Sequence, residues 1–162
     1  MNLIGKIINA MIAYYAGDVR RINHFLKVYG FAKAIGEMEG LDESTQEIIE
    51  IAALTHDIGI KNSEKKYNSS AGNYQQIEGP PEAKKLLAEL GIESGVIDRV
   101  CWLIAHHHTY TDIQGIDYQI LVEADFLVNF YEDDMSIDSV HSAGGKMFKT
   151  LSGKAILNAI YS

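Results

Sequence analysis

The chain has 162 residues and a formal net charge of −8 at pH 7, and 47% of its residues are hydrophobic. This length suits one domain with a full core, so we expect a single domain over residues 1–162. The acidic balance argues against a protein that holds nucleic acid by broad phosphate neutralisation, because that mode needs clustered lysine and arginine.

Membrane and export segments are not expected. No apolar stretch approaches the roughly 20 residues that span a bilayer. No small-residue cleavage site follows a convincing apolar segment near the N-terminus. We therefore expect a soluble, cytoplasmic protein with no membrane partner and no stable nucleic-acid complex.

Cys101 is the only cysteine, which excludes an intrachain disulfide and a cysteine-based zinc site. Any metal must therefore be bound by histidines and carboxylates. Some of the negative charges would then be ligands, so the net charge does not exclude a phosphorylated substrate.

Apolar residues recur at spacings of three and four along most of the chain, and strict alternation is absent. This pattern predicts an all-α bundle of about six to eight helices. The first three are expected at residues 3–15, 19–38 and 43–56, with Asp18 and Gly40 at the two ends of the second.

Residues 59–79 form the longest polar segment, and we expect a loop there with at most a short helical turn. A loop of about 15–20 residues in a compact domain is uncommon and is more often functional than idle. Pro80-Pro81 suits the first turn of a helix that would end at Gly91. The later helices are expected at residues 93–107 and 117–131, with one or two more at 136–161, broken near Gly144-Gly145 or Gly153.

The adjacent pair His56-Asp57 lies in an apolar run at residues 51–59. An unpaired polar group in a core costs about 1–3 kcal/mol, and an unpaired charge costs more. Two neighbouring metal-binding side chains at the end of a buried helix therefore suggest a shared cation. A simpler interpretation is a histidine and an aspartate that end the helix and face water.

Further candidate ligands lie beside other apolar stripes. His24 flanks the stripe of the second helix, and Asp125 interrupts an apolar run. His106-His107-His108 ends another apolar helix, where the imidazoles could instead act as a cationic cap. Together these helices indicate a divalent metal site with imidazole and carboxylate ligands, which suits Mn, Fe, Co, Ni, Zn or Mg.

The order of these residues resembles the HD-domain superfamily of metal-dependent phosphohydrolases, whose pattern is a His, a His-Asp pair and a terminal Asp. The matching positions here are His24, His56, Asp57 and Asp125. The resemblance covers about residues 20–125 and includes a complete His-Asp-Ile-Gly segment at 56–59. It implies a helical bundle of the HD-domain type.

The two-metal branch of that superfamily adds a His in a His-Gly-Pro segment and another after an Ile-x-x-His pattern. This chain has Glu78 at the first place and His107 at the second. A carboxylate still binds hard metals, so the resemblance implies Glu78 as a ligand with a shifted metal preference. Glu78 could also be a simple acidic residue near a helix N-terminus.

The resemblance implies a hydrolase in which one or two divalent ions activate a water that attacks a phosphoryl group. Asp57 would bridge two ions and so act directly in catalysis, with His106 and His108 beside the ions or the substrate. Arg21 and Lys61 would hold phosphate oxygens, although a lysine in a polar loop is more often only solvated. The implied metal ligands are His24, His56, Asp57, Glu78, His107 and Asp125.

The implied substrate is a phosphomonoester or phosphodiester of a nucleotide or a related small metabolite. Tyr67, Tyr74 and Tyr110 lie in polar segments near the candidate ligands, where they could stack on a base or simply pack. The superfamily also contains di-iron oxygenases with the same ligand order, and a non-catalytic module that binds a metal or a nucleotide is a third alternative. The oligomeric state stays open, because the helices at 136–161 could close the core or form a subunit contact.

Overall fold

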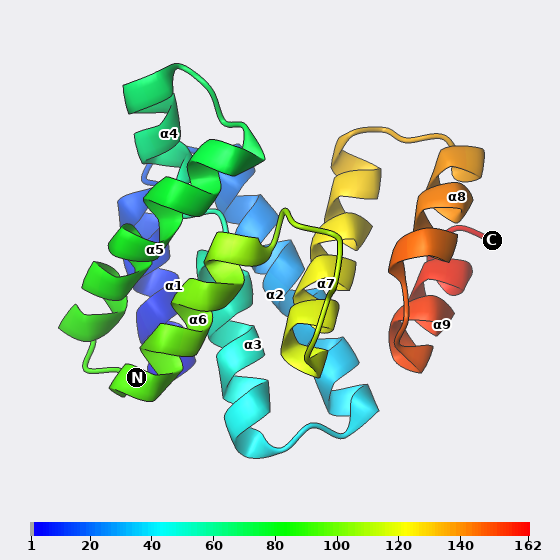
Figure 1. Ribbon diagram of the computed structural model, residues 1–162, viewed down its shortest axis with the longest axis horizontal. Coiled ribbons are helices and arrows are strands. Elements are labelled where there is room, and N and C mark those ends of the chain that lie inside the picture. Colours follow the sequence, from blue (N-terminus) through cyan, green and yellow to red (C-terminus); the bar gives the residue numbers. More distant parts are fainter. Residues whose placement is uncertain (1) are drawn as a thin grey trace.

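The computed structural model describes residues 2–162, which form nine α-helices and no strand (Figure 1). The all-α prediction is confirmed. None of the helices in this range is long and apolar enough to cross a membrane. The helices are α1 (Leu3–Tyr14), α2 (Val19–Glu39), α3 (Glu43–Thr55), α4 (Ile60–Tyr67), α5 (Gly72–Glu89), α6 (Ser94–His106), α7 (Ile116–Glu132), α8 (Ile137–Met147) and α9 (Leu151–Ile160).

Local signals fix both ends of α2. The Asp18 carboxylate accepts a hydrogen bond from the backbone N–H of Arg21 at 3.1 Å, which satisfies a donor of the first turn. Gly40 ends the helix with a φ of 72°, a left-handed conformation that glycine adopts at little steric cost. These caps determine the position of His24 within the helix.

The segment predicted as a loop at residues 59–79 is largely helical, so this prediction is wrong. It contains α4 and the first part of α5, which begins at Gly72. Helix α4 has no clear apolar stripe, because it buries only Ile60 and Ser63. The polar composition of this segment therefore reflects a short helix on the surface of the bundle.

The expected helix start at Pro80 is also wrong, because Pro80 and Pro81 lie inside α5. Two prolines remove two backbone donors from a helix interior and are usually found in the first turn. The residues before them include the buried polar side chains Gln75 and Glu78, which give no apolar periodicity. The sequence pattern therefore gives no signal for the true start of α5.

The C-terminal helices α8 and α9 are separated by Phe148–Thr150. The predicted break near Gly144-Gly145 or Gly153 is wrong. The Thr150 hydroxyl caps α9 by accepting the backbone N–H of Gly153 at 2.9 Å. Gly144 and Gly153 instead allow close packing, because a Cβ at either position would collide with a side chain of a neighbouring helix.

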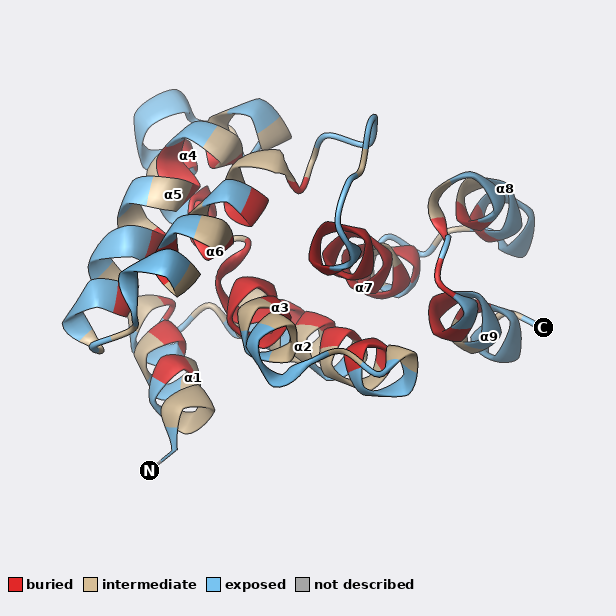
Figure 2. Cartoon of the chain, turned by 60° about the horizontal axis from the view of Figure 1, so that its bottom comes forward, coloured by how far each residue is buried: buried red, intermediate tan, exposed pale blue. Residues whose placement is uncertain are grey.

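Helices α2, α3 and α7 pack against one another at the centre of the molecule. Helices α4, α5 and α6 lie on one side of them, and α8 and α9 lie on the other side beside α7 (Figures 1 and 2). The second half of α3 and the following residue are buried from Ile49 through His56. The end of α3 is therefore enclosed by the other inner helices.

Candidate metal centre

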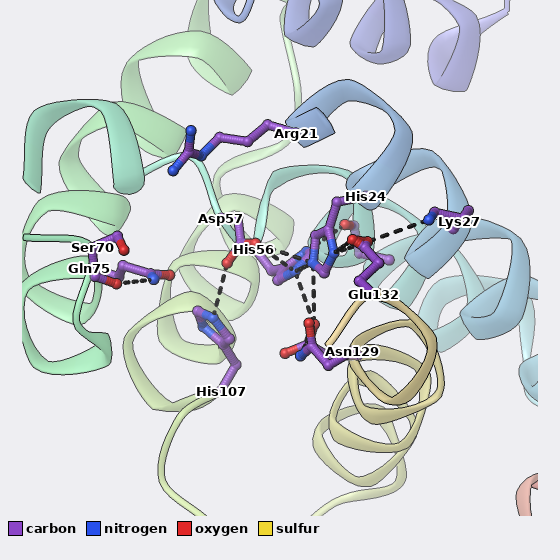
Figure 3. Close-up of polar contacts among 12 residues, drawn as sticks. Arg21, His24, Lys27, His56, Asp57, Ser70, Gln75, His107, Asn129 and Glu132 are labelled. Atoms are coloured by element: carbon purple, nitrogen blue, oxygen red, sulfur yellow. Dashed lines mark hydrogen bonds and ion pairs between the residues drawn. The ribbon is translucent and has the colours of Figure 1, made fainter. Parts of the chain in front are cut away.

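Four helices bring imidazole and carboxylate groups to one place. His24 belongs to α2 and Asp125 to α7, while His56 and Asp57 directly follow α3 and His107 directly follows α6. The side chains of His24, His56, Asp57 and His107 point toward one another (Figure 3). The predicted order of ligands along the chain thus becomes a cluster in space.

The three imidazole rings are held in the same way, by their Nδ1 atoms. Nδ1 of His24 donates to a carboxylate oxygen of Glu132 at 2.7 Å. In His56 and His107, Nδ1 donates at 2.7 Å to the backbone carbonyl three residues earlier. Carboxylates and carbonyls only accept, so Nδ1 carries the hydrogen and each Nε2 is left to face the cluster.

The Nε2 atoms converge on the two aspartates. Nε2 of His24 lies 3.2 Å from Nε2 of His56, 3.1 Å from Asp57 and 3.2 Å from Asp125. Nε2 of His107 lies 3.5 Å from Asp57 and, among residues 2–162, is a buried nitrogen with no hydrogen-bond partner. A buried, unpaired imidazole nitrogen beside a carboxylate is the arrangement that a metal cation satisfies.

Two groups of side chains have ligand atoms close enough to share an ion. One group is His24, His56 and Asp57, and the other is Asp57, His107 and His108. Within each group the ligand atoms lie within 4.8 Å of one another. Because Asp57 belongs to both, the residues fit one ion or two ions with a common carboxylate.

The charges in the cluster compensate one another. Burial disfavours a charged His24, yet its hydrogen bonds to Asp125 and Asp57 outweigh burial and raise its pKa to about 10. Burial also opposes the charged form of His56, but the charge of Asp57 raises its pKa. Burial would raise the pKa of both aspartates, but the facing imidazoles hold both pKa values well below 3.8. A divalent cation would supply the same compensation.

His108 faces the cluster as a neutral ring. Burial and the neighbouring His107 lower its pKa to about 4. Its Nε2 lies 3.1 Å from the amide oxygen of Gln75, whose nitrogen donates to the backbone carbonyl of Ser70 at 2.6 Å. A Cβ on Gly72 would lie 2.8 Å from the ring. The beginning of α5 therefore holds His108 in place.

Glu78 is not brought into the cluster. Its carboxylate accepts hydrogen bonds from Lys66 at 2.9 and 3.0 Å and from the Tyr67 hydroxyl at 3.1 Å. The bond from Lys66 also lowers the pKa of Glu78. Neither group of potential metal ligands includes it.

Lys61 and His106 also lie apart from the cluster. The Lys61 ammonium donates to the backbone carbonyl of Tyr14 at 2.9 Å and lies 4.8 Å from the centre of the Tyr14 ring. The His106 ring stacks on Trp102 with the ring centres 3.9 Å apart. Its Nδ1 donates to the Trp102 carbonyl at 2.7 Å.

A cavity of about 390 Å³ lies over the cluster. Arg21 lines it, but its guanidinium already pairs with Asp18 at 2.8 Å and with Glu64 at 2.5 Å. The cluster residues in its wall are His24, Asp57, His108 and Asp125. The other lining residues are Arg20, Arg21, Ile60, Ser70, Gln75, Asn129, Glu132 and Asp133.

Three residues that contact the cluster were not predicted from the sequence. Asn129 donates to Asp125 at 3.1 Å, and Glu132 holds His24. These two lie four and seven residues after Asp125, so helical spacing could have placed them on the same face. Gln75 lies in the segment predicted as a loop, where no helical spacing was assumed.

Comparisons with known proteins agree on the fold. A family model described as the HD domain matches residues 21–140, which is more than half of the chain. No curated protein matches. Among solved structures, the crystal structure of a "predicted HD superfamily hydrolase" from an uncultured Thermotogales bacterium matches with a TM-score of 0.69 and 20% identity. The match covers 97% of this chain and 84% of that chain, and at this identity it supports a shared fold alone.

Proposed function

The chain belongs to the HD domain family, and from this premise we propose that it is a metal-dependent phosphohydrolase that cleaves a phosphomonoester or phosphodiester of a small metabolite. One observation carries the proposal. The Nε2 atoms of His24, His56 and His107 converge on Asp57 while their Nδ1 atoms are held by other groups. Rings fixed in this tautomer are prepared for metal ligation.

We assign one ion to His24, His56, Asp57 and Asp125, and a second to Asp57, His107 and His108. When bound, a divalent ion lowers the pKa of water toward neutrality and offsets the charge of a phosphoryl group during attack. Glu78 would have to leave Lys66 to become a ligand, so His108 takes that place in this proposal.

The chain's own residues hold this arrangement in position. Glu132 and two backbone carbonyls fix the three imidazole rings. Asn129 donates to Asp125, and Gln75 fixes His108 at the cavity wall. Groups held before the substrate arrives need little reorganisation during the reaction, which favours catalysis.

The proposal is tested by measuring phosphate release with the metal-loaded protein and with Asp57→Asn. The variant keeps the size of the side chain but loses a negative ligand. We expect turnover to fall by at least about 100-fold, with an unchanged circular dichroism spectrum. Lys154→Gln, on the exposed surface of α9, is the control and should match the wild type.

Unchanged turnover in Asp57→Asn would contradict the proposal. Oxygen consumption by the iron-loaded protein, without phosphate release from any ester, would favour the oxygenase chemistry instead.

A further inference from the structure

We propose that the cavity accepts a small hydroxylated phosphomonoester, such as a sugar or polyol phosphate, in preference to a nucleotide, and that Arg20 contacts its phosphate. This inference rests on the proposed function and narrows its substrate class. In the reaction, a water oxygen bonds to phosphorus and the bond from phosphorus to the ester oxygen breaks. A proton from the water passes to the ester oxygen, and the products are the free alcohol and inorganic phosphate.

The size of the cavity favours a small substrate. Its volume of about 390 Å³ lies near the lower end of the roughly 300–1,000 Å³ typical of ligand pockets. The metal ions, the attacking water and the phosphate must share this volume with the rest of the substrate. Little space is then left for a nucleobase in addition to a sugar.

The described wall of the cavity offers no Phe, Tyr or Trp ring on which a base could stack. Within residues 2–162, its lining includes no Phe, Tyr or Trp, and Ile60 is its one aliphatic side chain. Proteins bind unpaired bases largely by stacking them on aromatic rings or on guanidinium groups, which contributes about 1–3 kcal/mol per base. Of the two guanidinium groups in the wall, that of Arg21 is paired with Asp18 and Glu64. The other belongs to Arg20, which we assign to the phosphate.

The tyrosines near the cluster are used in packing. Tyr67 and Tyr74 stack on each other, with ring centres 4.2 Å apart and an angle of 9° between the planes. The Tyr110 ring packs on Phe126 with the centres 5.1 Å apart, and its hydroxyl lies 3.4 Å from His108. Tyr67 and Tyr74 therefore cover one face of each other, and none of the three tyrosines lines the cavity.

The lining instead suits hydroxyl groups. Carboxylate and amide oxygens accept hydrogen bonds from alcohols, and the end of α7 supplies them from Asn129, Glu132 and Asp133. The Asn129 nitrogen donates to Asp125, which leaves its carbonyl oxygen as an acceptor. Ser70 and Gln75 add polar groups from the opposite wall.

Arg20 is the cation best placed for the phosphate. It lies four residues before His24, so both project from the same face of α2. Arg20 is exposed and lines the cavity, whereas Arg21 is occupied by two carboxylates. One such guanidinium beside several carboxylates matches a single phosphate better than a polyphosphate chain.

Ribose 5-phosphate and adenosine 5′-monophosphate test the substrate class, because they differ by the base. With the same metal, we expect kcat/KM for ribose 5-phosphate to be at least about 10-fold higher. An equal or higher value for the nucleotide would overturn the inference and leave the phosphohydrolase proposal intact.

Arg20→Gln tests the phosphate contact. We expect KM for ribose 5-phosphate to rise about 10-fold while kcat stays within about twofold. An interaction that is equally strong in the enzyme–substrate complex and in the transition state affects substrate binding alone. Lys154→Gln removes one charge far from the cavity lining and should leave KM unchanged. An unchanged KM in Arg20→Gln would overturn the assignment of Arg20.

If neither compound releases phosphate, hydrolysis of these two esters is excluded, and binding decides the inference separately. Isothermal titration of the metal-loaded protein with each compound then measures affinity without turnover. Tighter binding of ribose 5-phosphate would support the inference. Tighter binding of the nucleotide, or no binding of either compound, would overturn it.

Discussion

The orientation of single imidazole rings determines what the centre can bind. The Nδ1 atom of His24 donates to Glu132, which keeps the ring in one tautomer with Nε2 toward the aspartates. A carboxylate behind a metal-binding histidine also increases the basicity of the ligand nitrogen. Glu132 should therefore affect metal affinity although it is not itself assigned as a ligand.

Replacement of Glu132 by alanine is expected to weaken metal binding by about 10–100-fold, because His24 loses its acceptor. Competition with a chelator of known affinity measures the change. Glu132→Gln retains an acceptor oxygen and should lose less affinity. Equal affinity in Glu132→Ala and the wild type would show that Glu132 does not position His24.

Residue types along the chain predicted part of the centre. His24, His56, Asp57 and Asp125 were predicted from their positions beside apolar stripes, and the structure brings them together. Glu78 carries the same chemistry, but Lys66 already pairs with it. The spacing of residues in the sequence indicates the direction in which a side chain can point. Which charged group pairs with that side chain depends instead on the packing of neighbouring helices.

At the scale of helices, polar residues in the middle of α7 and at the start of α9 join the C-terminal helices to the core. Glu123 of α7 is fully buried and accepts hydrogen bonds from the Thr150 hydroxyl at 2.7 Å and its backbone N–H at 3.2 Å. Gly153 lies so close that a Cβ would collide with the Glu123 carboxylate. The interface between α7 and α9 therefore depends on a glycine at this position.

Gly153→Ala is expected to lower the free energy of unfolding by about 1–3 kcal/mol, because the added methyl group overpacks this contact. Denaturant unfolding measures the loss. Gly145→Ala is a matched control in α8, since a Cβ there meets no atom within 4 Å, and it should be neutral or stabilising by up to about 1 kcal/mol. Full stability of Gly153→Ala would contradict the tight contact.

A second contact at α9 should depend on pH. Glu39 of α2 accepts the backbone N–H of Ser152 at 2.8 Å, and hydrogen bonds from Ser152 lower the Glu39 pKa below 4.5. A lowered folded-state pKa means that the stabilisation is present above pH 4.5 and is lost as the pH falls through the lowered value.

The difference in Tm between the wild type and Glu39→Gln is therefore expected to be largest near neutral pH and to shrink below the ordinary pKa of 4.5. Thermal unfolding over a series of pH values measures it. A Tm difference that grows as the pH falls would contradict this prediction. It would show that the contact between Glu39 and Ser152 is not the source of the difference.

Helix boundaries were predictable where caps are local. Asp18 and Gly40 delimit α2 as expected, because each acts within its own turn. The start of α5 was not predictable, since Pro80 is typical of a first turn but lies in the middle of the helix. The break at Phe148–Thr150 was also missed, because Thr150 caps α9 while the nearby glycines serve packing against other helices.

At the scale of the whole molecule, the acidic composition and the fold together gather negative charge around the cavity. The net charge is −8, and the cavity wall includes Asp57, Asp125, Glu132 and Asp133. The central helices enclose part of this charge at the end of α3, where solvent screening is weakest. A cation bound at this place would compensate the charge, so metal binding is the central requirement of the proposed function.

Elemental mass spectrometry of the purified protein, in parallel with His56→Ala and the control Lys154→Gln, tests that claim most directly. We predict about one or two equivalents of a divalent metal per chain, retained in the control and lost in His56→Ala. The absence of stoichiometric metal in the wild type, even after anaerobic reconstitution with Mn or Fe, would contradict the account.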